Sequence, residues 1–150
     1  MPKHIDIYTD GSGKATGGVG AAASILVYGS HEREIVTGHQ ATNHNRMELE
    51  AVLQALVALH RDDCILTIYS DSQYVTRPFQ EGYIETWRNR HWRTHKGVPM
   101  PNADLWQRLY DACVRFTSVS FVWIRGHHGH VYNERCDKLA GAKRKALLKT

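Results

Sequence analysis

The spacing of apolar residues changes near position 46, and this change constrains the fold more than any other feature of the sequence. Before it, short apolar segments are separated by turns that contain glycine. Between Arg46 and His60 the apolar residues fall three or four positions apart, at Leu49, Val52, Leu53, Leu56 and Leu59. That spacing predicts a helix with one apolar face, so strands are followed by a helix.

Three strands are expected before this helix. His4–Thr9 predicts a strand that ends in the turn residues Asp10–Gly13. Ala21–Tyr28 follows a second glycine-rich turn, and Glu34–Gly38 follows the turn at Gly29–Ser30. Together these segments predict an antiparallel meander.

The second half of the chain alternates between strand and helix patterns. Cys64–Ser70 and Val119–Trp123 predict strands, while Gln73–Phe79, Leu105–Phe116 and Asp137–Leu148 predict helices. A strand, helix, strand order implies parallel pairing through a crossover. We therefore expect an α/β fold with a five-stranded mixed sheet, antiparallel meander plus parallel strands, flanked by helices. At 150 residues, the chain can bury one sizeable core, so residues 1–150 should form a single domain.

Charge and cysteine content narrow the functional classes. The formal net charge of +4 favours a polyanionic partner without identifying one. Cys64, Cys113 and Cys136 are too few and too far apart for a disulfide framework. No signal peptide is evident, and no apolar run approaches the roughly 18 residues of a membrane span. We expect a soluble, cytoplasmic protein with no membrane partner, and a monomer because no exposed apolar stripe is evident.

Four acidic residues stand at the ends of predicted elements, and each has an ordinary explanation. Asp10 precedes a glycine as turn residues often do, and Asp71 precedes a serine and could cap the next helix. Glu48 follows Asn45 by three positions, as in a capping box that starts the Arg46–His60 helix. Asp137 would suit a helix N-terminus.

The positions of these acids relative to one another favour a shared site. Asp10 and Asp71 both close apolar strands, and parallel strands end at the same edge of a sheet, where sites form. Glu48 and Asp137 begin predicted helices that can pack near that edge. Clustered carboxylates repel one another unless cations neutralise them. Oxygen ligands suit Mg²⁺ or Mn²⁺, and two such ions can support a phosphoryl displacement.

A histidine-rich loop, Gly126–His130, shortly precedes Asp137. It could be a solvated polar loop or a zinc site with Cys136, but the spacing matches no usual structural zinc site. A histidine beside a metal site could transfer a proton to a leaving oxygen, because its pKa lies near neutrality.

Several segments together resemble the motifs of bacterial type I ribonuclease H. These are Tyr8–Ser12, Asn45–Leu49, Tyr69–Val75, Gly126-His127 and Asn133–Asp137. The resemblance runs from about Ile5 to Ala142, with the four carboxylates in the family's order and at similar separations.

The resemblance implies an endonuclease that cuts the RNA strand of RNA·DNA hybrids and leaves a 5′-phosphate and a 3′-hydroxyl. Asp10, Glu48, Asp71 and Asp137 would hold two Mg²⁺ ions, and Asp71 would help to position the attacking water. His127 resembles the family's mobile histidine, which assists leaving-group protonation or product release. The adjacent His128 is the competing candidate for that role.

The resemblance also implies substrate contacts. Gly11 falls within the first motif, and Asn45 and Gln73 resemble the family's contacts to the 2′-hydroxyl, which separates RNA from DNA. A basic protrusion that grips the DNA strand would comprise Trp87, Arg88, Arg90, His91, Trp92, Arg93, His95 and Lys96. The alternative for Trp87 and Trp92 is a place in the core.

The sequence departs from the family pattern at two places. Thr16-Gly17 stands where an Asn-Pro pair is usual, and Asn43-His44-Asn45 stands where Thr-Asn-Asn is common. Thr16 and Asn43 thus resemble an exchange of two residues of a pocket for a DNA phosphate. His44 could contact the substrate or face water.

Three further alternatives depend on features of the whole chain. The tail beyond Ala142 contains four cations and no acid, which suits a solvated helix end or a nucleic-acid contact. Resolvases, integrases and proofreading exonucleases have related carboxylate sites, but Asn45, Gln73 and the basic stretch favour a hybrid nuclease. A hybrid-binding module without catalysis should lack a metal ligand, and none is missing.

Overall fold

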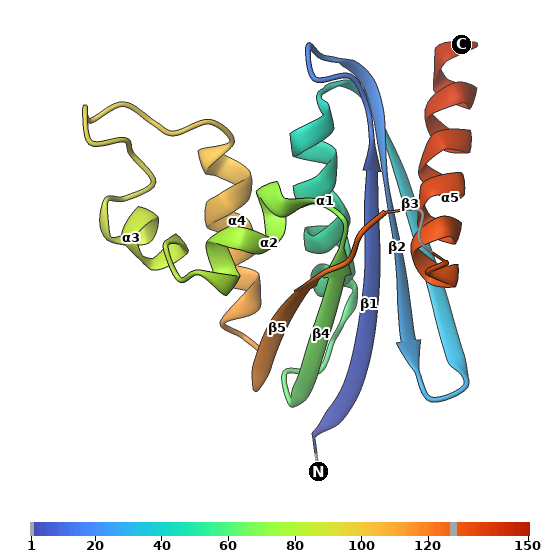
Figure 1. The fold of residues 1–150 in the computed structure, drawn as a ribbon, viewed down its shortest axis with the longest axis horizontal. Coiled ribbons are helices and arrows are strands. Elements are labelled where there is room, and N and C mark those ends of the chain that lie inside the picture. The colour runs from blue at the N-terminus through green and yellow to red at the C-terminus, as the bar shows by residue number, and fades with distance from the viewer. Residues whose placement is uncertain (1, 127–128) are drawn as a thin grey trace.

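The computed structural model describes residues 2–126 and 129–150, which form a five-stranded sheet with helices on both faces (Figure 1). The strands are β1 (Lys3–Ser12), β2 (Gly18–Tyr28), β3 (His31–Thr42), β4 (Cys64–Ser70) and β5 (Ser118–Trp123). Their order across the sheet is β3-β2-β1-β4-β5. The pairs β1/β2 and β2/β3 are antiparallel, and β1/β4 and β4/β5 are parallel. The mixed sheet is therefore confirmed.

The helices divide between the two faces of this sheet. They are α1 (His44–Ala58), α2 (Gln73–Gln80), α3 (Ile84–Asn89), α4 (Ala103–Cys113) and α5 (Val131–Leu148). In Figure 1, α1 and α4 lie on one side of the sheet and α5 lies on the other. The apolar stripe of α1 is buried against β1, β2 and α4, with Leu49, Val52, Leu53 and Leu56 at most 2% exposed. The helix forms there mainly because it buries this stripe.

Strand β1 is longer than its sequence pattern indicated. Its parallel pairing with β4 ends at Tyr8 and Tyr69, but its antiparallel pairing with β2 continues to Ser12. The turn expected at Asp10–Gly13 is therefore wrong for Asp10, which pairs with Ala23 inside the strand. The reason is tertiary, because the β2 partner supplies hydrogen bonds that override local turn preference.

Two acidic residues lie deeper in their helices than expected. The first helix is capped by Asn43, whose side chain accepts a hydrogen bond from the Arg46 N–H at 3.0 Å, so the capping box at Asn45 is wrong. Glu48 is consequently beyond the first turn and 1% exposed. Helix α5 begins at Val131, so Asp137 is almost two turns inside it. The stretch between the second and third predicted helices also contains the short helix α3, which the spacing did not reveal.

Helix α5 is held against the sheet at both ends. Near its start, Arg135 pairs with Glu32 at 2.8 Å and Glu34 at 2.7 Å on β3. Near its end, a Cβ atom added to Gly38 would lie 2.3 Å from Leu147 Cδ1, which shows how closely the helix approaches β3. These contacts fix the direction of α5 across β1, β2 and β3.

In the described part of the chain, no helix is long and apolar enough to span a membrane.

Candidate active site

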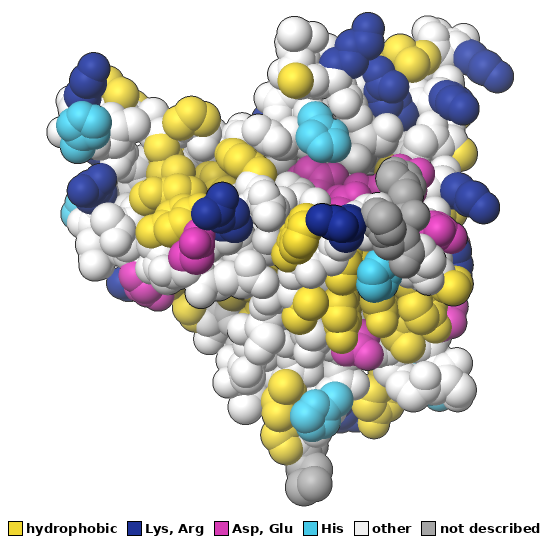
Figure 2. Space-filling model, viewed as in Figure 1, with side chains coloured by type: hydrophobic (Ala, Val, Ile, Leu, Met, Phe, Trp, Pro, Cys, Tyr) yellow, Lys and Arg dark blue, Asp and Glu magenta, His cyan; other side chains and the backbone are white. Residues whose placement is uncertain are grey.

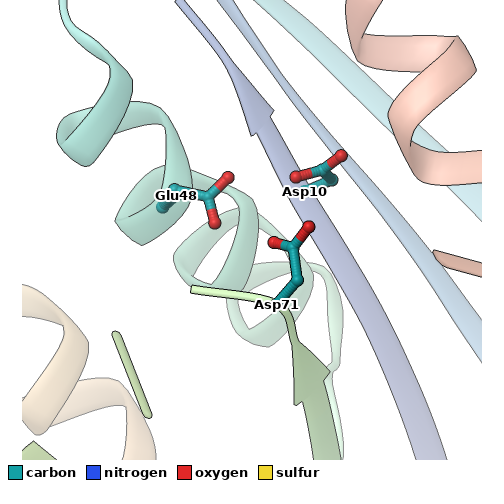
Figure 3. A group of neighbouring side chains, drawn as sticks. All are labelled: Asp10, Glu48 and Asp71. Atoms are coloured by element: carbon teal, nitrogen blue, oxygen red, sulfur yellow. The ribbon is translucent and has the colours of Figure 1, made fainter. Parts of the chain in front are cut away.

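Three carboxylates from three elements converge beside the end of β4 (Figure 3). Asp10 projects from β1, Glu48 from α1 and Asp71 from the residue after β4. One oxygen of each lies within 4.8 Å of the others. The parallel pairing of β1 with β4 brings Asp10 and Asp71 to one place, and the packing of α1 on β1 adds Glu48.

Glu48 reaches the site because Gly11 leaves room for it. The Gly11 N–H lies 3.0 Å from Asp10 Oδ1 and also donates to Glu48 Oε1. A Cβ atom on Gly11 would lie 2.6 Å from both the Glu48 nitrogen and the Met47 carbonyl carbon. Glycine thus permits the contact between β1 and α1 that carries Glu48 into the cluster.

The second oxygen of Glu48 has no such partner. Glu48 Oε2 is buried and accepts no hydrogen bond from any residue that the structure describes. A buried carboxylate oxygen without a donor is costly unless a cation or a proton satisfies it. This atom, facing two further carboxylates, fits a divalent cation of the Mg²⁺ or Mn²⁺ type.

The electrostatics of the cluster have the same implication. Burial, followed by the charge of Asp71, raises the pKa of Asp10 to about 8. Burial, followed by the charges of Asp10 and Asp71, raises the pKa of Glu48 well above its usual range. A bound cation would oppose both effects by compensating the negative charge.

These shifts predict that the metal-free protein loses stability as the pH rises. Asp10 loses its proton near pH 3.8 when unfolded but holds it to about pH 8 when folded, so the folded state binds more protons between these values. The stabilisation is complete below about pH 4 and is lost by about pH 8. Urea unfolding in EDTA across this range should show a smaller decline for Asp10→Asn than for the unmodified protein. Equal declines in the two proteins would contradict the prediction.

The fourth predicted ligand lies at the edge of this cluster. Asp137 is exposed on α5 and is not among the three residues that converge within 4.8 Å. Its charge and a side-chain hydrogen bond to Asp10 nevertheless both contribute to the raised pKa of Asp10, so its carboxyl group lies close to that of Asp10. His127 and the alternative His128 lie outside the described residues.

The segment before the histidine loop contacts Asp71. A Cβ atom on Gly126 would lie 2.9 Å from Asp71 Oδ2, and Trp123 Nε1 donates to the Asp71 carbonyl at 3.0 Å. Glycine at position 126 therefore allows the chain to pass close to the carboxylate. The zinc alternative is wrong for Cys136, whose buried thiol donates to the Tyr8 carbonyl in the contact between α5 and β1.

A hollow lies above the acidic side chains (Figure 2). Acidic groups lie on its floor, and two raised parts of the surface flank it in this view. On one flank, Asn43 caps α1, and the neighbouring His44 N–H donates to the Lys14 carbonyl at 3.1 Å. This bond places the turn that contains the exposed Thr16 beside the start of α1. His44, Asn45 and Gln73 are also exposed, at or near helix starts.

The other flank contains the predicted basic protrusion. Arg88, Arg90, Arg93 and Lys96 are exposed there. Trp92 is only 7% exposed and Trp87 is half-buried against Trp106, so both rings serve mainly as core. The Arg88 guanidinium lies 5.2 Å from the centre of the Tyr110 ring, which orients it from below.

One supporting residue had no signal in the sequence. Arg46 on α1 forms two hydrogen bonds with Asp104, at 3.0 and 2.9 Å, and a third with the Asn102 side chain at 3.1 Å. These contacts join the helix that carries Glu48 to the base of the protrusion. Asn102 and Asp104 lie more than 50 positions from Arg46 in the sequence, so no local pattern could indicate these contacts.

Comparison with known proteins connects this arrangement to a family. The profile of the RNase H family matches residues 2–145. The ribonuclease H of Cronobacter sakazakii is 44% identical over 142 residues, covering 95% of this chain and 88% of its own. The ribonuclease H of Cupriavidus metallidurans is 46% identical over 138 residues, which cover 92% of this chain and 93% of the relative. Ribonuclease HI of Haemophilus influenzae is 41% identical over 140 residues, covering 93% and 89%.

Solved structures agree with this relationship. The crystal structure of LC9-RNase H1, described as a type 1 RNase H with the type 2 active-site motif, superposes with a TM-score of 0.84 at 26% identity. The superposed region covers 97% of this chain and 74% of the LC9-RNase H1 chain. The foamy viral protease-reverse transcriptase in complex with dsDNA gives a TM-score of 0.81 at 19% identity and covers 96% of both chains, a likeness of fold alone.

Proposed function

The chain belongs to the ribonuclease H family, and from this membership we propose that it cuts the RNA strand of RNA·DNA hybrids internally. The products would be a 5′-phosphate and a 3′-hydroxyl. Residues 1–150 would act as one catalytic domain and as a monomer. The observation that carries the proposal is the convergence of Asp10, Glu48 and Asp71, with one buried Glu48 oxygen lacking a donor among the described residues.

The acidic residues would hold two divalent cations, Mg²⁺ in the first instance and Mn²⁺ as the alternative. Asp10 is positioned for this by its strand, and Glu48 by its bond to the Gly11 N–H. Asp71 and, from α5, Asp137 would complete the ligand set. Bound Mg²⁺ supplies charge stabilisation at the phosphate and lowers the pKa of the attacking water.

The remaining catalytic work would fall to protein groups. Asp71 would orient the attacking water, because it is the most exposed of the three converging carboxylates. His127 would deliver a proton to the leaving oxygen or assist product release, since an imidazole titrates near neutral pH. His127→Ala should therefore lower the rate of turnover more than the affinity for substrate.

The substrate would lie across the hollow above the carboxylates. Asn45 and Gln73 are exposed at helix starts beside the cluster, where their amides could bond 2′-hydroxyl groups and the Gly11 backbone could approach the RNA strand. On the protrusion, Arg88, Arg90, Arg93 and Lys96 would contact phosphates of the DNA strand. The half-buried Trp87 could add ring contact, whereas the burial of Trp92 leaves little surface for it.

A comparison of three duplexes tests this function. The protein is incubated with end-labelled RNA·DNA hybrid, double-stranded RNA and double-stranded DNA, in Mg²⁺ or in EDTA. We expect internal cuts only in the RNA strand of the hybrid and only with Mg²⁺. Cleavage of DNA would assign the chain to another nuclease branch, and binding without cleavage would make it a recognition module.

The predicted phosphate pocket gives a second test. Thr16→Ala and Asn43→Ala should each raise the KM for hybrid about 3- to 10-fold with little change in kcat, because a phosphate contact would be lost. Asn43 also caps α1, so its variant should lose about 1 kcal/mol of stability as well. Asn43→Asp retains the cap but adds negative charge, and it separates the two effects. Unchanged KM in both alanine variants would show that this pocket is absent.

A further inference from the structure

The last part of α5 carries positive charge that no acidic residue compensates. Asp137 is the last acidic side chain of the sequence, and five cations follow it: Lys138, Lys143, Arg144, Lys145 and Lys149. Within the described residues none of these five forms an ion pair, whereas five arginines elsewhere do. The charge is therefore available to a polyanion.

Helical geometry separates these cations into different directions. Arg144 follows Asp137 by seven residues, so it lies on the same side of α5, about 10 Å further along the axis. Cys136 and Ala140 face the sheet and are fully buried. Lys138, Lys145 and Lys149 form a stripe that points away from the sheet. Lys143 lies on the sheet side, where its Cε would be 3.1 Å from a Cβ atom on Gly38.

Arg144 is the cation that the structure holds most firmly. Its Nε–H donates to the Val19 carbonyl at 3.1 Å, and the residue is half-buried. Val19 follows the turn that contains Thr16 and lies near the start of β2. The guanidinium is thus fixed beside the Thr16 turn, and its other N–H groups form no hydrogen bond with any residue that the structure describes. A guanidinium fixed in this way can bind phosphate with little loss of side-chain entropy.

The surface view agrees with this placement. Figure 2 shows dark-blue side chains gathered at the upper right, over the end of the molecule where Figure 1 places the C-terminal half of α5. They lie on the same visible face as the acidic floor of the hollow. A duplex seated over the carboxylates could therefore extend onto this surface.

We propose that Arg144 binds the phosphate backbone of the hybrid beyond the Thr16 turn. This inference rests on the proposed function, because it assumes that a duplex lies over the carboxylate cluster. It extends the interface to a helix that the basic protrusion does not include. At about 10 Å from Asp137, the contact would involve phosphates several base pairs from the one that is cut.

Salt dependence of binding tests this contact. Fluorescence anisotropy with a labelled hybrid of about 24 base pairs, in EDTA to prevent turnover, gives Kd as a function of KCl concentration. Arg144→Gln should raise Kd about 3- to 10-fold at low salt and reduce the slope of log K against log salt by about 0.7 to 0.9.

Two variants separate charge from structure. Arg144→Lys also loses the bond to Val19 but keeps the positive charge, so it should retain the slope even if it loses stability to the same extent. Lys3→Gln removes one charge at the opposite end of β1, about 20 Å from Asp10, and should leave the slope unchanged. If the slope of Arg144→Gln equals that of Lys3→Gln, the proposal is overturned.

The outcome for Arg144 is distinguishable from that for catalysis. Hybrid binding with the expected loss of slope, but without Mg²⁺-dependent cleavage by the unmodified protein, would support this contact and reject the proposed catalysis. Cleavage by the unmodified protein, with an unchanged slope in Arg144→Gln, would support the proposed catalysis and reject the Arg144 contact. Failure of the unmodified protein to bind hybrid at all would overturn both.

Discussion

Asp10→Asn is expected to reduce hybrid cleavage at saturating Mg²⁺ by at least about 1,000-fold, equivalent to about 4 kcal/mol of transition-state stabilisation. Asp10 is 5% exposed and faces both Glu48 and Asp71. The substitution removes a negative charge from the site that would hold the cations. It preserves shape, because the Asn oxygen can still accept the Gly11 N–H bond that Asp10 Oδ1 accepts at 3.0 Å. Single-turnover cleavage of labelled hybrid measures the effect.

Stability provides the control for this variant. Removing one of three repelling carboxylates should leave the metal-free Asp10→Asn protein folded and more stable than the unmodified protein at about pH 8. Calorimetric titration with Mg²⁺ should show weaker binding. An inactive variant that is also unfolded would leave the loss attributable to folding, in which case Glu48→Gln gives a second measurement at the same cluster. Near-normal cleavage by a folded Asp10→Asn protein would refute the assignment of Asp10 as a ligand.

Gly11→Ala is expected to damage both the fold and the site. The added Cβ would lie 2.6 Å from two backbone atoms of α1, which cannot move without shifting the helix from β1. We expect a loss of about 2 to 4 kcal/mol in the free energy of unfolding. Because the shift would displace Glu48, cleavage should fall about 100-fold or more in the fraction that remains folded. Urea unfolding and single-turnover assays give the two values.

Gly141→Ala is the matched stability control. It makes the same chemical change in α5, where a Cβ atom would meet nothing within 4 Å. Alanine should stabilise that helix by up to about 1 kcal/mol. Equal stability of Gly11→Ala and Gly141→Ala would contradict the prediction that the close approach of β1 to α1 excludes a Cβ atom at position 11.

The sequence by itself determined the classes of the elements and most of their order. Alternation and apolar runs specify the strands, and the stripe from Leu49 to Leu56 specifies α1, because local periodicity records which side of an element is buried. The boundaries were less accurate. Asp10 lies inside β1 rather than in a turn, and Asn43 rather than Asn45 caps α1, because the β2 partner and the packing of α1 decide where each element ends.

The site shows the same division. Residue types and spacing indicated which carboxylates could act together, since Asp10 and Asp71 each stand at the end of an apolar run that predicts a strand, and parallel strands end at one edge of a sheet. Only the tertiary structure decided which of them converge, leaving Asp137 outside the group of three within 4.8 Å. It also decided that Trp92 is buried and that Arg144 lies against Val19. These facts depend on contacts between residues far apart in the chain, and local preferences carry no information about such contacts.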